Sequence, residues 1–520
     1  MTLLVKMLDG EYWWGGSVST AEVNPFDKNS VFDYDMERGN NQTMPFFLSN
    51  LGRYIWCEKP MKVHIEGGEI SLSANDEIIL CKAGDSLRDA YLCASKKHFP
   101  FSGKIPPIDF FTTAQFNTWM EMDYNQTQEG VLKYAHGLVE HGYNGGVLMI
   151  DEGWHTRYGL WEFDFHKFPD PKAMVDELHA LGFKVMLWVV PLVTPDGRDY
   201  VLASQSYCGN LRGGAAGKTH FLRTDEGRPA LVDWWNGTSA ILNMCREDDR
   251  EFLDKKLRFL MDEYGVDGFK FDGGNISMYN PGRVTNGAQT HYTADELNIA
   301  WNEFGARYEY HEYKDTFKGG GKPVIQRLQD RRHSWNEHGL TSVLPSALLQ
   351  GLIGHPFICP DMVGGGSWSA NYDPEFVCDE ELFIRMAQMS ALFPMMQFSW
   401  APWRMLSEES AELCLKASQL HREFAPYITS LVKESATTGE PIVRHMEYEF
   451  PHSGYELVEN QFMLGSDYLV CPVVEKGQRE IEVALPSGKW LYLGQTEYEG
   501  GKAVVVPAPL DTLVYFKKAN

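Results

Sequence analysis

Residues 146–193 read GVLMIDEGWHTRYGLWEFDFHKFPDPKAMVDELHALGFKVMLWVVPLV, and this stretch decides the fold class. It opens with an apolar run of strand length, continues with apolar residues at helical spacing from Pro171, and ends in a second apolar run. Two apolar strands joined by a helix form a parallel βαβ unit. Asp151 and Glu152 directly follow the first run, so the stretch also predicts acidic side chains at a strand end.

The same alternation of strand and helix continues on both sides of this stretch. Counting the units gives about eight, which favours a (β/α)8 TIM barrel over an open sheet. In such barrels the functional site lies at the carboxyl ends of the strands. The further strands are predicted at residues 114–122, 266–272, 323–330, 355–361 and 395–400, and the further helices at 128–140, 250–264, 380–393 and 407–435.

The two ends of the chain have a different pattern, in which short segments alternate polar and apolar residues. MKVHIEGGEISLSA at 61–74 and REIEVALP at 479–486 are examples, and both are typical of antiparallel strands. We therefore expect an α/β chain with three domains. These are an N-terminal β-sandwich (1–105), a catalytic (β/α)8 barrel (106–432) and a C-terminal β-sandwich (433–520), with long loops on the barrel at 196–236 and 275–292.

The charge of the chain restricts its partners. Seventy-one acidic residues against 47 basic ones give a formal net charge of −24 and a pI near 5.1. Such a chain is not expected to bind nucleic acid or an anionic membrane surface, and a neutral or cationic small molecule is the better match. The sequence has neither a His-Glu-x-x-His motif nor a phosphate-binding loop, so no metal and no cofactor are expected.

Cysteine usage and the first residues bear on location. The nine cysteines are scattered without a Cys-x-x-Cys pair, which favours reduced thiols in a cytoplasmic protein. The opening residues MTLLVKMLDGEYWWGG do not have the apolar core of a signal peptide, and no apolar run approaches the roughly 18 residues of a membrane span. We expect a cytoplasmic protein, and the sequence leaves its oligomeric state open, a homo-oligomer included.

The stretch VDGFKFDGGN at 266–275 places a lysine and a carboxylate close together at a strand end. Because side chains alternate along a strand, Lys270 and Asp272 share one face, which would point into the barrel. An ion pair that closes a barrel layer is one interpretation. The other is chemical, because Asp330 ends a second predicted strand, and two carboxylates in one site are what glycosidic bond cleavage needs.

Several segments together resemble the retaining α-glycosidases of glycoside hydrolase family 31. FKFDGG at 269–274 is similar to the strand that carries the family's nucleophile, and GLIGHPFICPDMVGGG at 351–366 to the strand after its acid/base loop. MPFFLSNLGRYIW at 44–56 resembles the segment that enters the pocket from the sandwich. The resemblance continues into the tail at 460–493, so it covers all three predicted domains.

The resemblance implies a role for each matching residue. Asp272 would be the nucleophile and Asp330 the acid/base. Some of the matching residues also have a structural interpretation. The tryptophans could simply fill the core, and Asp151 and Glu152 could cap a helix or pair with an arginine. Asp361 could be a structural carboxylate. The residues predicted to contact the substrate are Asp151, Glu152, Trp188, Lys270, Arg327, Asp361, Trp119 and Trp400.

Two departures from the α-glucosidase pattern refine the expected specificity. Lys314 stands near the place where the family carries an arginine, and Gln397 and Ser399 stand where it carries Arg-x-His. The whole set resembles the family's α-galactosidase branch most, which implies an exo-acting retaining hydrolase of terminal α-linked galactose. An α-glucosidase or other α-glycosidase, a non-catalytic carbohydrate-binding homologue, and a Schiff-base lyase that uses Lys270 are the alternatives.

Overall fold

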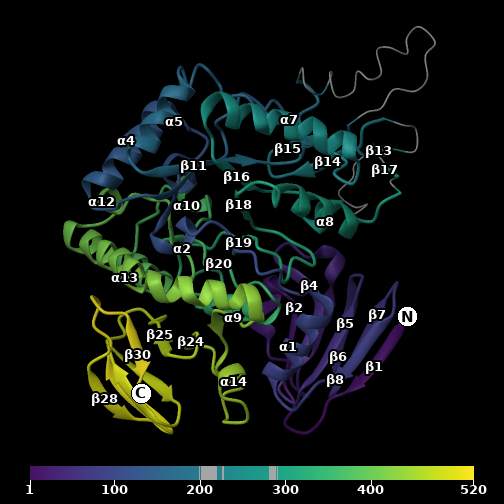
Figure 1. The fold of residues 1–520 in the computed structure, drawn as a ribbon, viewed down its shortest axis with the longest axis vertical. Helices are drawn as coiled ribbons and strands as arrows, with labels where there is room; N and C mark the ends of the chain where they lie inside the picture. Colours follow the sequence, from purple (N-terminus) through teal and green to yellow (C-terminus); the bar gives the residue numbers. More distant parts are fainter. Residues whose placement is uncertain (198–199, 201–219, 225–227, 280–287, 290, 520) are drawn as a thin grey trace.

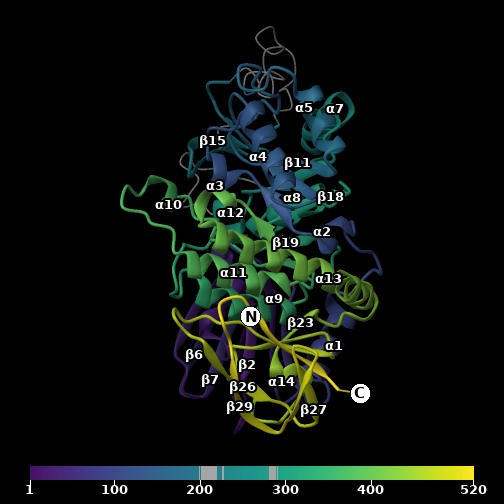
Figure 2. The same cartoon turned by 90° about the vertical axis from the view of Figure 1, so that its left-hand side faces the viewer.

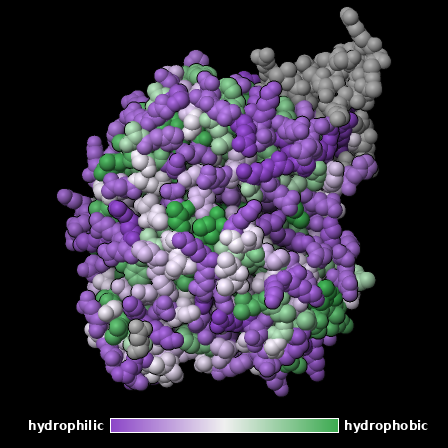
Figure 3. Space-filling model, in the orientation of Figure 1, coloured by the Kyte–Doolittle hydropathy of each residue, from purple (hydrophilic) through white to green (hydrophobic). Residues whose placement is uncertain are grey.

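The computed structural model describes residues 1–197, 200, 220–224, 228–279, 288–289 and 291–519. Figure 1 shows a barrel above two β-rich units, one formed by the N-terminal residues and the other by the C-terminal residues. The view in Figure 2, turned by 90°, shows that both units lie at the same end of the barrel. The visible surface in Figure 3 is largely hydrophilic, with smaller hydrophobic patches between.

The N-terminal unit is a β-sandwich, as predicted. Its two four-stranded sheets have the orders β1-β7-β6-β3 and β2-β4-β5-β8, and their apolar faces share one core. Helix α1 (Leu87–His98), capped by Ser86 and Asp89, was not predicted, and the expectation of strands up to residue 105 is wrong there. The strands are β1 (Thr2–Lys6), β2 (Trp13–Ser17), β3 (Phe32–Asp35), β4 (Thr43–Ser49), β5 (Arg53–Cys57), β6 (Met61–Glu66), β7 (Glu69–Ala74) and β8 (Ile78–Lys82).

The middle of the chain forms the predicted barrel. Its sheet has nine parallel strands in the order β20-β19-β18-β16-β11-β10-β9-β22-β21. The strands at the two ends of this order are adjacent in sequence, so the sheet must curl round to bring its edges together. The strands are β9 (Gln115–Asn117), β10 (Gly146–Ile150), β11 (Phe183–Val189), β16 (Gly268–Phe271), β18 (Tyr310–Tyr313), β19 (Ile325–Arg327), β20 (Ile358–Cys359), β21 (Met362–Val363) and β22 (Gln397–Phe398).

All five predicted barrel helices are confirmed, but several other elements were missed. Strand β18 has the sequence YHEY, which contains no apolar run and so gives no strand signal. Helix α9 (Val343–Leu352) is almost entirely buried, so its sequence lacks the alternation of apolar and polar faces that indicates a helix. Helix α8 (Ala294–Gly305) was also missed. The confirmed helices are α4 (Gln128–Glu140), α5 (Pro171–Ala180), α7 (Glu247–Tyr264), α11 (Glu380–Ala391) and α13 (Glu408–Thr438).

The first of the two predicted long loops contains strands instead. β14 (Leu231–Trp234) pairs with β15 (Gly237–Ile241), and β15 pairs with β12 (Leu192–Val193). The prediction of a loop is therefore wrong for this part. In the second loop the structure has a short 3-10 helix at Ile276–Tyr279 and strand β17 (Ala288–Gln289), which pairs with β13 (Arg223–Thr224). The remainder of both segments lies outside the described residues.

The C-terminal unit is a second β-sandwich, and α13 runs between it and the barrel in Figure 1. A six-stranded sheet packs with a two-stranded one around a core that includes Trp490 and Phe516. No helix in the described part of the chain is both long and apolar enough to cross a membrane. The strands are β23 (Val443–Arg444), β24 (Phe462–Leu464), β25 (Tyr468–Cys471), β26 (Glu480–Leu485), β27 (Lys489–Tyr492), β28 (Thr496–Glu499), β29 (Lys502–Pro507) and β30 (Val514–Lys518).

Candidate active site

A cavity of about 450 Å³ opens at the carboxyl ends of the barrel strands. Asp151 follows β10, Asp272 follows β16 and Lys314 follows β18, so parallel strands deliver charged groups to one edge. The residues that line the cavity are Trp119, Tyr124, Asp151, Glu152, Trp188, Trp235, Asn236, Lys270, Asp272, Lys314, Asp330 and Trp368. Seven of the ten residues that the sequence predicted for the site are therefore brought together.

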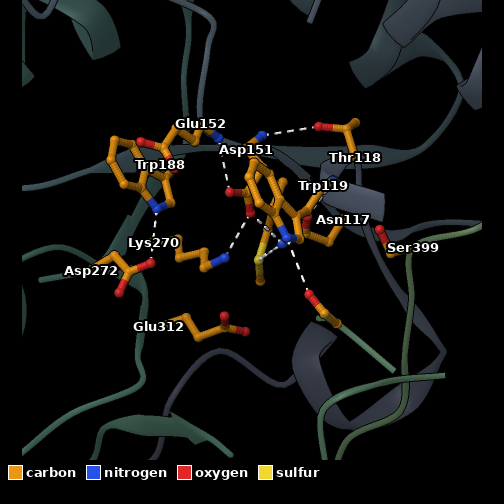
Figure 4. Close-up of polar contacts among 12 residues, drawn as sticks. Asn117, Thr118, Trp119, Asp151, Glu152, Trp188, Lys270, Asp272, Glu312 and Ser399 are labelled. Carbon is orange, nitrogen blue, oxygen red and sulfur yellow. Dashed lines mark hydrogen bonds and ion pairs between the residues drawn. The ribbon is translucent and has the colours of Figure 1, made fainter. Parts of the chain in front are cut away.

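The carboxylate of Asp272 is buried and held by two N–H donors. The indole Nε1 of Trp188 donates to Oδ2 at 3.0 Å, and the backbone N–H of Gly273 donates to Oδ1 at 2.9 Å. Burial alone would raise the pKa of Asp272, but Lys314, Lys270 and the Trp188 indole outweigh burial and lower it. Asp272 is therefore an anion with both carboxylate oxygens hydrogen-bonded, and Figure 4 shows its bond to the Trp188 indole.

Lys270 does not form its ion pair with Asp272, its neighbour two residues along the strand. Its Nζ donates to Asp151 Oδ2 at 2.7 Å, across strand β11, and Asn117 Nδ2 donates to the same oxygen at 2.8 Å (Figure 4). Both Lys270 and Asp151 are almost fully buried, yet both line the cavity. The pair closes a layer of the barrel and forms part of the cavity floor.

Lys314 connects the two carboxylates that the sequence proposed as catalytic. Its Nζ lies 3.2 Å from Asp330 Oδ2 and 3.7 Å from Asp272 Oδ2. These two oxygens are therefore no more than about 7 Å apart, a limit that includes the separation of about 5–5.5 Å found in retaining glycosidases and excludes most of the range of about 6.5–9.5 Å found in inverting ones. Burial would lower the pKa of the Lys314 ammonium, but the two carboxylates raise it above its ordinary value.

Asp330 is the more accessible carboxylate of the two and has a second cationic partner. Arg327 Nη2 donates to its Oδ1 at 2.9 Å, while Lys314 binds the other oxygen. Burial would raise the pKa of Asp330, but Lys314, Arg327 and Lys270 hold it well below its ordinary value. Asp330 is consequently ionised in this arrangement.

Three predicted site residues do not line the cavity. Arg327 is fully buried behind Asp330 and also pairs with Asp361 and, at 3.3 Å, with Glu312. Asp361 is fully buried too, and accepts from the backbone N–H of Arg331 at 2.7 Å. Arg327 and Asp361 are thus placed to orient Asp330 rather than to touch a ligand in this cavity.

Trp400 is the third residue outside the cavity. Its ring packs against Phe376, with centroids 5.4 Å apart, and against His333 at 5.8 Å. It contributes to a neighbouring hollow on the surface instead. The two residues that replace the family's Arg-x-His also lie behind the wall: Gln397 donates to Glu312 at 3.1 Å, and Ser399 accepts from the backbone N–H of Met120 at 2.7 Å.

The β14–β15 hairpin supplies part of the cavity wall that sequence reasoning missed. Its two-residue turn is Trp235-Asn236; Trp235 Nε1 donates to Glu152 at 3.2 Å, and Asn236 Nδ2 donates to the other Glu152 oxygen. Burial raises the pKa of Glu152 to about 8 although hydrogen bonds from Tyr158 and Trp235 lower it, and the charges of Asp151 and Asp272 add to the rise. The Asn-Gly pair after LVDWW was an available hairpin signal.

Other wall residues were also missed, and one predicted contribution does not occur. Tyr124 and Trp368 come from segments whose polar and aromatic residues show no period. Lys314 was noted in the sequence only as standing near the family's arginine, and its place in the wall was not predicted because it follows the unrecognised strand β18. Every described lining residue lies between Trp119 and Trp368, so residues 44–56 do not enter the cavity as expected. In the part of the chain that the structure describes, no cluster of His, Cys, Asp or Glu is arranged to hold a metal ion.

Comparison with known proteins places this site in a family. Residues 109–431 match the family model "Glycosyl hydrolases family 31 TIM-barrel domain", and residues 439–520 match "Glycosyl hydrolase family 31 C-terminal domain". The myogenesis-regulating glycosidase of Mus musculus is 30% identical over 82% of this chain. An alpha-glucosidase of Saccharolobus solfataricus is 25% identical over 73%, and an isomaltosyltransferase of Sporosarcina globispora 26% identical over 68%.

The chain spans only part of these relatives: 59%, 58% and 33% of their lengths, respectively. Solved structures share the fold at low identity. A sulfoquinovosidase from E. rectale has a TM-score of 0.83 at 17% identity, covering 100% of this chain and 82% of that one. A dextranase from Flavobacterium johnsoniae has a TM-score of 0.82 at 17% identity, covering 99% and 66%. With more than half its length matched by the barrel model, the chain belongs to glycosyl hydrolase family 31.

Proposed function

We propose that this chain is an exo-acting retaining α-glycosidase in which Asp272 is the nucleophile and Asp330 the acid/base. The observation that carries the proposal is the position of Lys314, whose ammonium lies 3.2 Å from Asp330 and 3.7 Å from Asp272 inside one cavity. Two carboxylates this close can act on opposite sides of one glycosidic bond. The names of the relatives, a glycosidase and an alpha-glucosidase among them, agree with this chemistry.

The proposed reaction has two displacements. Asp272 attacks the anomeric carbon, the bond to the leaving oxygen breaks, and Asp330 gives that oxygen its proton, which leaves a glycosyl ester on Asp272. Water then attacks the same carbon while Asp330 takes a proton from that water molecule. The ester bond to Asp272 breaks, and the sugar leaves with its configuration retained. The indole N–H of Trp188 holds the attacking carboxylate in position throughout.

The charges around Asp330 suit the second displacement directly, because a base must be ionised. The first displacement needs the protonated form. Because the pKa of Asp330 is lowered, only a small fraction of it is protonated at neutral pH. Turnover of substrates with poor leaving groups should therefore rise as the pH falls, until Asp272 is protonated as well. Lys314 is the group whose displacement by an incoming sugar would raise the pKa of Asp330.

Terminal α-linked galactose is our finer proposal for the sugar. It is supported by the departures at Lys314, Gln397 and Ser399 from the α-glucosidase pattern. The relatives reported above are named for other sugars or for none, and further relatives are named alpha-xylosidases, so α-glucosides and α-xylosides are the alternatives within the class. A small-molecule sugar substrate and a cytoplasmic location are part of the same proposal, and cell fractionation tests the latter.

The first experiment measures p-nitrophenol release from the α-galactoside, α-glucoside and α-xyloside by the wild type and by Asp272→Asn. We expect turnover of one glycoside that the substitution abolishes, and nuclear magnetic resonance should show the α-anomer as the first product. Faster turnover of the glucoside than of the galactoside would overturn the choice of galactose. Sugar binding with no turnover of any glycoside would support the non-catalytic alternative.

The second experiment tests Asp330. Asp330→Ala should lower kcat/KM on the order of 10²–10⁴-fold for oligosaccharides, because their alcohols leave only when protonated. Glycosides with dinitrophenolate as leaving group need no proton and should lose much less. An equal loss on both substrate types would remove Asp330 from the acid/base role.

The Schiff-base alternative has a simple test. Lys270 Nζ is engaged by Asp151 at 2.7 Å and is nearly inaccessible, which disfavours attack on a carbonyl. Borohydride reduction in the presence of a carbonyl sugar, followed by mass spectrometry, should leave the protein mass unchanged. A covalent adduct on Lys270 would instead support the lyase.

A further inference from the structure

Two tryptophans in the cavity wall differ from the others in their exposure. Trp119 and Trp188 are buried, whereas Trp235 is 51% exposed and Trp368 is 52% exposed. All four line the same cavity. A side chain that lines a cavity and is also half exposed to solvent must lie at its mouth, so the mouth carries two accessible indole rings.

A second hollow, of about 490 Å³, lies beside this mouth. The two cavities share their walls: Trp119 faces the catalytic cavity while Met120 faces the hollow, and Trp368 faces the first while Ala370 faces the second. The shared segments are α3 (Trp119–Met122) and residues 368–372, which comprise Trp368 and α10 (Ser369–Tyr372); α3 and α10 lie near each other in Figure 2.

Specific contacts join the two walls. Asn371 Nδ2 donates to the backbone carbonyl of Met120 at 3.3 Å, and Trp119 Nε1 donates to that of Gly366 at 3.2 Å. The ring of Trp368 contacts that of Tyr372, with centroids 5.3 Å apart and planes at 79°. Tyr372 is itself 58% exposed and lines the hollow. Exposed aromatic surface therefore continues from the catalytic mouth into the hollow.

The hollow also offers polar groups beside these rings. Asp123, Asn371 and Asp373 line it, and so does Arg404, which is bound to Glu121 at 2.7 Å. A pyranose ring has an apolar C–H face and a rim of hydroxyls. Aromatic rings bind the C–H face by stacking, and carboxylates and amides bind the hydroxyls by hydrogen bonds.

We propose that Trp235, Trp368 and Tyr372 form a binding site for the sugars on the leaving-group side of an oligosaccharide substrate. Trp235 and Trp368 contact the first sugar after the cleaved bond, and Tyr372, with Asn371 and Asp373, contacts the next. This inference rests on the proposed hydrolase activity and extends it, because it makes the natural substrate an oligosaccharide of at least three sugars. A planar aromatic leaving group is the competing occupant.

The test compares substrates that share the terminal sugar but differ in the leaving group: the glycosyl fluoride, the p-nitrophenyl glycoside and a linear trisaccharide. Each of Trp368→Ala and Tyr372→Ala should lower kcat/KM for the trisaccharide about 2–10-fold more than for the fluoride, which has no sugar to stack. Val377→Ala, on the same segment and 82% exposed, should leave that ratio as in the wild type. Both side chains are exposed, so we expect the variants to fold.

Three outcomes decide the matter. Equal losses on trisaccharide and fluoride would overturn the proposal, and a loss confined to the p-nitrophenyl glycoside would assign the site to aromatic leaving groups. A wild type that does not hydrolyse the fluoride would refute the hydrolase activity instead. In that case the affinity for the trisaccharide, measured by tryptophan fluorescence, still tests the site. Trp368→Ala should weaken this binding and Val377→Ala should not.

Discussion

At the scale of single residues, Lys314 has the largest influence on the charge of the proposed catalytic pair. Its ammonium lowers the pKa of both Asp272 and Asp330. Lys314→Met should therefore shift both limbs of the pH profile of kcat/KM to higher pH and lower the maximum. Lys314→Arg keeps the positive charge and is the control, with limbs close to those of the wild type. Unshifted limbs in the methionine variant would show that other groups set the two pKa values.

Glu152 gives a second prediction at this scale, on stability. Its pKa rises from 4.5 to about 8 in the folded protein, so between these values the folded state holds a proton that the unfolded state has lost. The contribution of Glu152 to the free energy of unfolding is present below pH 4.5 and falls as the pH rises towards 8. Glu152→Gln, neutral throughout, should remove this decline.

Chemical denaturation at pH 5 and pH 8 measures the difference. The stability of the wild type relative to Glu152→Gln should fall between the two values. Parallel curves for Glu152→Gln and the wild type would mean that Glu152 is already ionised at pH 5.

At the scale of elements, the β14–β15 hairpin holds Glu152 through its turn. Gly237 follows the turn with φ +93°, and a Cβ there would meet no atom within 4 Å, so a side chain would add backbone strain alone. Gly237→Ala should cost about 1–2 kcal/mol of stability and should raise KM several-fold, because Trp235 and Asn236 would shift. Gly67→Ala, in the β6–β7 turn with φ +59° and equally open space, should cost similar stability with unchanged kinetics. Identical kinetics in both variants would remove the hairpin from substrate recognition.

At the scale of the whole molecule, the N-terminal sandwich reaches the site through Gln42 although it does not line the cavity. Gln42 is fully buried; its Nε2 donates to the carbonyl of Arg327 at 2.9 Å and its Oε1 accepts from Gln350 at 2.9 Å. The sandwich thereby holds the strand end that leads to Asp330. Gln42→Ala should cost about 1–3 kcal/mol of stability, the usual penalty for unpaired buried groups, and should also lower kcat.

The matched control for this substitution is Gln461→Ala in the C-terminal sandwich. Gln461 is also buried and exchanges two hydrogen bonds of 2.9 Å with the backbone of Ala484. Its loss should lower stability to a similar degree without changing kcat. If both variants kept the wild-type kcat, the N-terminal sandwich would stabilise the fold without positioning the site.

How far the sequence could predict the molecule depended on whether the signal was local. Periodicity is a property of neighbouring residues, so helix α4 was predicted at its observed bounds and the strand before Asp151 was recognised. Elements without a local signal were missed, such as α9, which is buried on every side, and β18, whose residues are polar. The division into three domains at residues 105 and 432 stays a prediction.

By itself the sequence determined that the chain is built from parallel βαβ units and that several carboxylates meet at one edge of the sheet. This follows because the carboxyl ends of parallel strands lie at the same edge, however the sheet closes into a barrel. Only the tertiary structure decided which charges touch. It placed Lys314 between Asp272 and Asp330, paired Lys270 with Asp151, and turned Trp400 away from the cavity. The physical reason is that these contacts join strand ends far apart in the chain, and their geometry depends on how the sheet curls and on which loops cover it.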